Sequence, residues 1–220
     1  MRSPVSFKPL WIVAILGATI VSYAPRASAL SFDLTTCDMS TGCLAPGTSY
    51  GTVNVTQVSS GVVDVTLTLA PGEVFANTGA GDALLFDLQG ISSITIPTIP
   101  PITPGFTATT TSGSIHADGT GTWQYGVSCT GCGPGTSSSL SGPLNFDVAA
   151  GGITPASFTK NSNSLYFAAD IGVPSSSCGA SGYCTGDVGT PTAVPLPAAA
   201  WLLLSGLAGV GAMARRKLAA

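Results

Sequence analysis

The chain has 220 residues, with ten acidic and seven basic side chains and a formal net charge of −3. Six of the seven basic residues lie in the two terminal segments, 1–29 and 194–220, whereas all ten acidic residues lie between them. The central segment therefore sets ten carboxylates against Lys160 alone, a net charge of −9. Such a surface repels phosphate backbones, which excludes nucleic-acid binding.

The N-terminal segment, 1–29, has the pattern of a secretory signal peptide. Arg2 and Lys8 precede an apolar stretch over 10–21, and Ala27-Ser28-Ala29 follows as a small-x-small site for signal peptidase. We predict cleavage after Ala29. The alternative is an uncleaved anchor, for which an apolar stretch of about 12 residues is short.

The segment 30–172 is predicted to be a single β domain, because Gly and Pro interrupt it every few residues and no sustained 3.6-residue apolar period occurs. The clearest strand is 62–69, whose apolar and polar residues alternate. We expect it to form an antiparallel hairpin with 51–58. Further strands are expected at 83–88, 91–96, 106–111, 121–127, 141–149 and 165–171. This spacing predicts an all-β fold, an antiparallel β-sandwich or jelly-roll-like domain.

Residues 173–193 are rich in Gly, Ser, Pro and Cys and are predicted to be a linker. The six cysteines form three local pairs, and an even count in an exported chain favours disulfides. Local pairing is the simplest of fifteen connectivities. Cys129-Thr-Gly-Cys132 also matches a redox or metal motif, although the following Gly133-Pro134-Gly135 opposes the helix that redox chemistry needs. The candidates are Cys37, Cys43, Cys129, Cys132, Cys178 and Cys184.

No residue pattern between the two terminal segments indicates catalysis. His116 is the only histidine, and Ser114, His116 and Asp118 on one strand would lie in a row rather than converge as a triad. Asp82, Asp118 and Asp187 lie in Gly-rich loops, where Ca²⁺ sites often form, although aspartate is also an ordinary turn residue. Five aromatic residues could line a sugar-binding face or pack in the core: Trp123, Tyr125, Tyr50, Tyr166 and Phe106. We assign no catalytic residue, metal site or cofactor.

The C-terminal segment, 194–220, combines three signals in order. Val194-Pro195-Leu196-Pro197-Ala198 begins it, a run without ionisable side chains follows over 198–214, and Arg215-Arg216-Lys217 ends it. At 1.5 Å per residue, a helix over this run is about 26 Å long, close to the thickness of a bilayer core. The three cations favour the cytoplasmic side, so a transmembrane helix with its C-terminus inside is predicted.

These three signals together resemble the PEP-CTERM sorting signals in their VPLPA variant. Proteins with such signals occur in Gram-negative bacteria that make exopolysaccharide. The central Pro-Glu-Pro of the family is replaced here, with Leu196 between the two prolines. The resemblance covers about 25 residues and implies processing by exosortase, a multi-pass membrane protease or transpeptidase. A plain anchor that is never cleaved is the alternative.

From these observations we expect a non-enzymatic exported protein. Before processing it would span the inner membrane with its C-terminus in the cytoplasm, and afterwards it would lie at the cell surface or outside the cell. Its expected partners are signal peptidase, an exosortase-like membrane protease and the inner membrane. Association with biofilm or exopolysaccharide is implied by the resemblance alone. The alternatives are a carbohydrate- or Ca²⁺-binding surface module and a secreted hydrolase.

Overall fold

A computed structural model describes residues 28–78, 81–97, 102–110, 112–178 and 181–195. In these ranges the chain forms sixteen β-strands and one 3₁₀ turn, η1 (Pro155–Ser157), without an α-helix. Every strand pairing between them is antiparallel. The prediction of an all-β fold is thus confirmed.

The first sheet has five strands in the order β12-β4-β3-β1-β16. Their bounds are β1 (Ala29–Asp33), β3 (Gly51–Ser59), β4 (Val62–Leu69), β12 (Leu144–Ala149) and β16 (Val194–Pro195). The alternation in β4 places Asp64, Thr66 and Thr68 on the outer face and four apolar residues against the core: Val63, Val65, Leu67 and Leu69. β3 and β4 form the predicted hairpin, and Gly61 in its turn has a φ of 78°.

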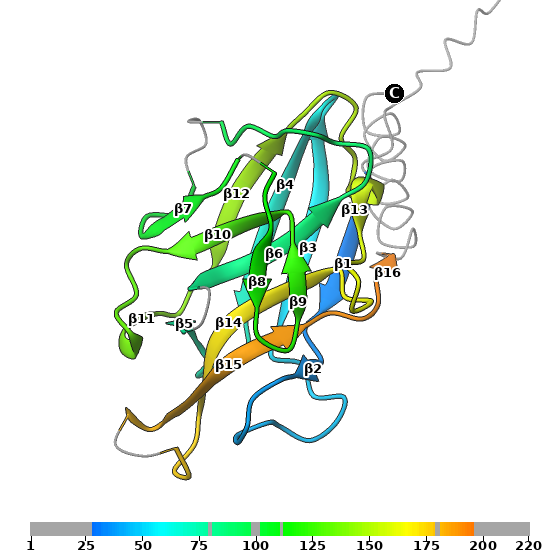
Figure 1. The fold of residues 1–220 in the computed structure, drawn as a ribbon. Helices are drawn as coiled ribbons and strands as arrows, with labels where there is room; N and C mark the ends of the chain where they lie inside the picture. The colour runs from blue at the N-terminus through cyan, green and yellow to red at the C-terminus, as the bar shows by residue number, and fades with distance from the viewer. Residues whose placement is uncertain (1–27, 79–80, 98–101, 111, 179–180, 196–220) are drawn as a thin grey trace, which may run out of the picture.

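The second sheet has nine strands, with the central path β11-β5-β14-β6-β10-β7 and with β13, β15 and β2 attached to it. The bounds are β2 (Thr36–Cys37), β5 (Val74–Asn77), β6 (Asp82–Leu88), β7 (Phe106–Ala108), β10 (Tyr125–Cys129), β11 (Gly135–Leu140), β13 (Phe158–Thr159), β14 (Phe167–Pro174) and β15 (Tyr183–Gly189). Figure 1 shows this sheet in front of the first.

One hydrophobic core fills the space between the two sheets. Aromatic pairs cross it: Phe32 of β1 lies 4.9 Å from Phe167 of β14, and Phe86 of β6 lies 6.3 Å from Phe146 of β12, measured between ring centroids. Two antiparallel sheets that share one core fit the predicted sandwich.

A small hairpin covers part of the outer face of the second sheet (Figure 1). It consists of β8 (Ile115–Ala117) and β9 (Gly121–Trp123), and the indole of Trp123 is 1% exposed. Trp123 belongs to a second apolar cluster with Leu85 of β6 and Ala168 of β14. Because the hairpin covers the outer face of the sheet here, the residues of β6 are buried on both faces of the strand.

The prediction of a linker over 173–193 is wrong. β14 continues to Pro174, and β15 pairs with it through seven residue pairs from Ala168↔Gly189 to Pro174↔Tyr183. Val188 is fully buried, and β2 pairs with the other edge of β15. Small and hydroxylated residues can form a strand between two neighbouring strands, because the hydrogen bonds of a β-sheet join backbone groups and do not depend on the side chains.

Several predicted strands differ from the observed ones. Residues 91–96 form no strand and contribute isolated bridges at Ser93 and Thr95, the latter paired with Ala149, and the predicted strand over 106–111 ends at Ala108. The predicted strand over 121–127 is divided between β9, which belongs to the covering hairpin, and β10, which pairs with β6 and β7.

The predicted signal peptide lies outside the described residues except for Ser28 and Ala29, and the predicted transmembrane helix over 198–214 lies wholly outside them. The described part of the chain contains no helix of the length and hydropathy that a bilayer crossing requires.

Candidate functional site

The predicted processing sites meet at one edge of the first sheet. Ala29, the residue before the predicted cleavage, begins β1, and Val194 and Pro195 of the sorting motif form β16 beside it. The remaining predicted residues, Ala27, Leu196, Pro197, Ala198, Arg215, Arg216 and Lys217, lie outside the described residues. The structure thus brings the two predicted processing points to neighbouring strands.

The six cysteines form three local disulfides: Cys37–Cys43, Cys129–Cys132 and Cys178–Cys184. Cys129 ends β10, and the strand that follows Cys132 is β11, so no helix follows this C-x-x-C sequence. A thiol-redox motif needs a helix N-terminus to lower a thiol pKa, and this geometry favours a structural bond instead.

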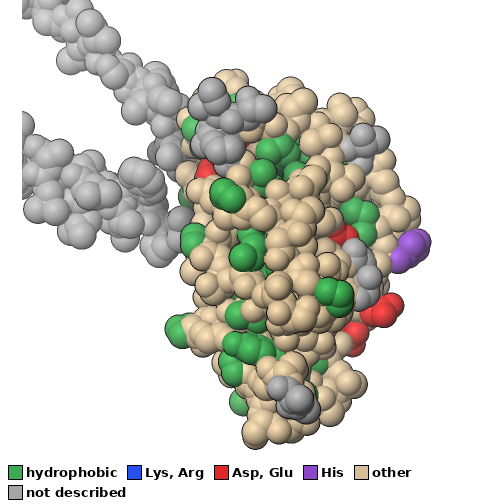
Figure 2. Space-filling model, turned by 90° about the vertical axis from the view of Figure 1, so that its left-hand side faces the viewer, with side chains coloured by type: hydrophobic (Ala, Val, Ile, Leu, Met, Phe, Trp, Pro, Cys, Tyr) green, Lys and Arg blue, Asp and Glu red, His purple; other side chains and the backbone are tan. Residues whose placement is uncertain are grey.

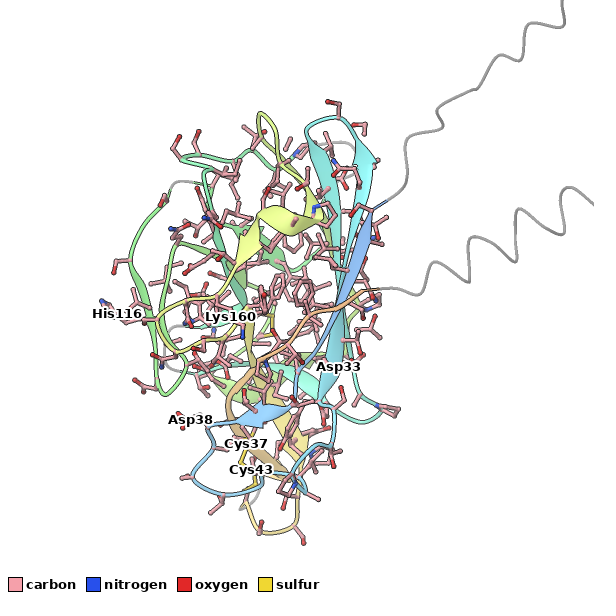
Figure 3. All side chains as sticks on the ribbon, turned by 90° about the vertical axis from the view of Figure 1, so that its right-hand side faces the viewer. Asp33, Cys37, Asp38, Cys43, His116 and Lys160 are labelled. Atoms are coloured by element: carbon pink, nitrogen blue, oxygen red, sulfur yellow. A yellow bond between two sulfur atoms is a disulfide. The ribbon has the colours of Figure 1, made fainter. Side chains whose placement is uncertain are left out.

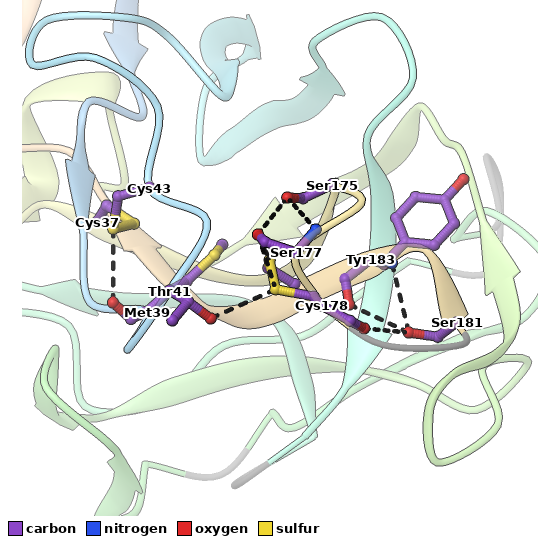
Figure 4. The surroundings of a disulfide bond; sticks show 10 residues. Cys37, Met39, Thr41, Cys43, Ser175, Ser177, Cys178, Ser181 and Tyr183 are labelled. Carbon is purple, nitrogen blue, oxygen red and sulfur yellow. Dashed lines mark hydrogen bonds between the residues drawn. A yellow bond between two sulfur atoms is a disulfide. The ribbon is translucent and has the colours of Figure 1, made fainter.

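Two of the disulfide loops pack against each other, as Figure 4 shows. The Thr41 hydroxyl lies 3.3 Å from Cys178 Sγ. Gly42 has a φ of 91°, and a Cβ at this position would overlap the Cys184 side chain. Glycine is therefore required here both for its conformation and for the close approach of the two loops.

The clearest concentration of polar groups is an acidic cleft of about 290 Å³. We define it by the carboxylates that line it: Asp38 after β2, Asp118 in the β8–β9 turn and Asp187 in β15. Thr78, Thr185 and Gly186 contribute to its wall. A backbone hydrogen bond of 2.9 Å, from the N–H of Asp38 to the C=O of Asp187, holds two of these elements together.

A fourth carboxylate lies behind the cleft. Asp170 of β14 is 1% exposed and stands directly opposite Asp187 in the β14–β15 ladder. Its Oδ1 accepts a hydrogen bond of 2.6 Å from the hydroxyl of Thr78, and its Oδ2 accepts one from the Thr78 N–H. These bonds offset part of the cost of burying the carboxylate.

The electrostatics of the cleft favour protonation of Asp187. Burial, followed by the nearby Asp170 carboxylate, raises its pKa to about 7, and Asp118 and Asp38 add to the shift. A hydrogen bond of 3.3 Å from the Thr120 hydroxyl acts in the opposite direction. Burial also raises the pKa of Asp170. Lys160 is the only lysine or arginine in the described ranges, and Figure 2 shows acidic side chains near the histidine on a face without basic ones.

A second polar depression of about 390 Å³ adjoins the cleft, and both share Asp38. Thr36, Thr120 and Asn163 contribute to its lining, and the buried hydroxyl of Thr36 has no hydrogen-bond partner. Gly119 in the hairpin turn has a φ of 73° and closely approaches the Asp38 carboxylate, so a side chain at this position would displace Asp38.

The other predicted candidates are separated. His116 is exposed on β8 (Figure 3), and its Nδ1 lies 3.0 Å from the hydroxyl of Thr122. Among the described residues, its ring makes no hydrogen bond with Ser114 or Asp118. Asp82 is buried in β6, where it accepts a hydrogen bond of 2.7 Å from Ser128. Of the five aromatic candidates for a sugar-binding face, Trp123, Tyr125, Tyr50 and Phe106 are buried and only Tyr166 is partly exposed, so these residues do not form an exposed platform.

Sequence reasoning identified Asp118 and Asp187 as candidate cation ligands but missed Asp38 and Asp170. An available signal for Asp170 was a carboxylate within the apolar strand Phe167-Ala-Ala-Asp-Ile171. As placed in the described ranges, no three His, Cys, Asp or Glu side chains converge on a common metal position.

Comparison with known proteins found no matching family, no matching curated protein and no matching solved structure.

Proposed function

We propose that this chain is an exported, non-enzymatic β domain that its C-terminal signal sorts to the cell surface or the extracellular matrix. The observation that carries the proposal is that the fold runs from Ala29 to Pro195, from one predicted processing signal to the other. Three disulfides within this domain fit an oxidising compartment outside the cytoplasm.

The partners follow from the two terminal signals. Signal peptidase would release the N-terminus, and the predicted helix over 198–214 would hold the domain in the inner membrane with Arg215-Arg216-Lys217 in the cytoplasm. An exosortase-like protease would then act near Val194-Pro195-Leu196-Pro197-Ala198. Exopolysaccharide is the matrix component that the resemblance favours as a neighbour of the released domain.

Mass spectrometry of the surface fraction tests this proposal. The expected chain begins at Leu30 and lacks Arg215-Arg216-Lys217. A triple alanine substitution of these three residues should impair retention at the membrane and lower the yield of processed protein. A matched control, Lys160→Ala, changes a cation of the body and should leave processing unchanged. An intact basic tail on all surface material would refute processing.

A second candidate function is Ca²⁺ binding at the acidic cleft. One observation favours it: Asp118 of the β8–β9 turn and Asp187 of β15, which are far apart in sequence, line the same cleft together with Asp38. Oxygen ligands of this kind suit Ca²⁺, and a bound cation would offset the repulsion among them. The buried aromatic residues make a carbohydrate platform the weaker form of this alternative.

Thermal unfolding of the purified protein tests the calcium proposal. Added CaCl₂ should raise the melting temperature, and Asp118→Asn should remove most of this increase. Asp33→Asn is the matched control, because Asp33 lies on β1, outside the cleft, where its carboxylate accepts a hydrogen bond from the Thr52 hydroxyl. An identical melting temperature in CaCl₂ and in excess chelator would exclude Ca²⁺ binding by the folded protein.

A further inference from the structure

The start of the sorting motif is an edge strand of the folded domain. Val194 pairs with Ser31 and Pro195 pairs with Leu30 in an antiparallel ladder between β16 and β1 (Figure 1). β1 also pairs along its whole length with β3, so β16 is the terminal strand of the five-stranded sheet. The first two residues of the motif therefore belong to the sheet.

The backbone directions of β1 explain why a proline fits here. The C=O of Ser28 accepts a hydrogen bond of 2.9 Å from Gln57 of β3, and the N–H of Leu34 donates one of 2.9 Å to Gly51. The odd-numbered Thr35 instead donates to the C=O of Gly189 at 2.9 Å, on the opposite side of the strand. By the alternation of antiparallel ladders, Ser31 directs its N–H and C=O toward β16, whereas Leu30 directs its own toward β3.

It follows that Ser31 and Val194 form the hydrogen-bonded pair, and Leu30 and Pro195 the non-hydrogen-bonded one. Proline lacks an N–H, and edge strands accept it where no ladder bond is required. Position 195 meets this condition. The sequence of the motif is thus compatible with the pairing that the structure contains.

We propose that β16 gates the processing of this chain: while Val194 and Pro195 pair with β1, the sorting protease cannot bind the motif. This inference rests on the proposed function, since it concerns access to the same sorting signal. Proteases bind their substrates as extended strands through backbone hydrogen bonds, and the bonds of Val194 are already used by β1. Processing then requires β16 to leave the sheet, a local opening that does not require the domain to unfold.

The short length of β16 allows this gate to open easily. Two paired residues contribute few ladder bonds, so the open state is reached far more often than global unfolding. The gate also depends on the start of β1, because the predicted cleavage removes Ala29 and leaves Leu30 and Ser31, the two partners of β16, as the first residues of the chain. A chain that has not formed β1 would expose its motif, and one that has folded would withhold it.

The test compares processing rates by pulse–chase in cells that carry the sorting protease. Ser31→Pro removes the one N–H that β1 directs to Val194 and keeps the bonds of Leu30 to β3. We expect the tail to be lost about fivefold faster, the factor that one backbone hydrogen bond contributes to an opening equilibrium. Ser31→Ala retains the N–H and is the matched control, with the rate of the natural chain.

A second variant leaves β1 untouched. Insertion of Val-Pro-Gly-Ser-Gly-Ser between Ala193 and Val194 supplies a substitute edge strand and places the motif six residues farther from the sheet. Processing should again be faster than in the natural chain. If the natural chain is processed and both variants, folded by circular dichroism, are processed at its rate, the gate is refuted. If no chain loses its tail, the proposed function itself fails.

Discussion

Asp187 stands in a ladder position opposite another carboxylate, and its removal should stabilise the protein at neutral and alkaline pH. Burial and the Asp170 carboxylate raise the pKa of Asp187 to about 7 from 3.8, its ordinary value. Because the folded state holds the proton more tightly than the unfolded state, the contribution of Asp187 to stability is most favourable below about pH 4. It falls as pH rises through the window up to about 7.

The size of this effect follows from the pKa shift. About three pKa units correspond to about 4 kcal/mol at full effect. The side chain is only partly buried, so solvent screening reduces this to about 2 kcal/mol. Asp187→Asn removes the charge and keeps an oxygen that can accept the hydrogen bond from Thr120. We therefore expect the variant to gain about 2 kcal/mol at pH 8 and almost nothing at pH 4.

Urea unfolding at pH 4, 6 and 8, with the disulfides intact, measures this difference. Asp33→Asn serves as the control, because it removes an exposed carboxylate and should change the free energy of unfolding by less than about 0.5 kcal/mol at each pH. A loss of stability in Asp187→Asn of equal size at pH 4 and pH 8 would refute the reasoning. It would mean that packing at this position outweighs charge.

Three further substitutions test other parts of the structure. Glu73 is 4% exposed, and burial raises the pKa of its carboxyl to about 7 from 4.5, so Glu73→Gln should raise the melting temperature more at pH 8 than at pH 5. Asp147 of β12 lies directly opposite Asp64 of β4, and the two carboxylates repel each other. Asp147→Asn should therefore stabilise the protein by about 0.5–1 kcal/mol at pH 7, measured by chemical denaturation. Asn145→Ala, two residues away on the same face, should give no such gain. Gly42→Ala should cost more than about 2 kcal/mol of unfolding free energy because the methyl group meets Cys184. Gly47→Ala, at a similar φ of 84° but in open space, should cost less, and equal losses would show that contact with Cys184 is unimportant.

The sequence predicted well those strands that have one buried and one solvated face. The strand predicted over 62–69 has the bounds of β4, because its valines and leucines alternate with Asp64, Thr66 and Thr68. β15 was missed because Gly186, Gly189, Thr185 and Asp187 separate its few apolar residues, Tyr183, Cys184 and Val188, so no period-2 alternation appears. Its place in the sheet comes from pairing with β14 and β2, which are distant in sequence. A local pattern contains no information about such partners.

The acidic cleft could be predicted only in part for the same reason. Its carboxylates come from the segment after β2, the β8–β9 turn and β15, and Asp170 of β14 lies behind it, so only the folded sheet brings these elements together. Neighbouring glycines identified Asp118 and Asp187 individually. The structure links them through Asp38, which Gly119 closely approaches and whose N–H donates a hydrogen bond to the C=O of Asp187, and these contacts join segments that are distant in sequence.

If the tail is removed as we propose, the charge of the domain would determine whether it stays at the membrane surface. The segment between the two predicted signals sets ten carboxylates against Lys160, and the three cations of the C-terminal segment would leave with the tail. A domain of this charge has no electrostatic attraction to anionic lipid, so the apolar run over 198–214 would be its only hold on the membrane. Cleavage would then release the domain completely rather than leave it bound to the bilayer surface. In that sequence of events, the β1–β16 pairing that we propose as a gate would control both maturation and the moment of release.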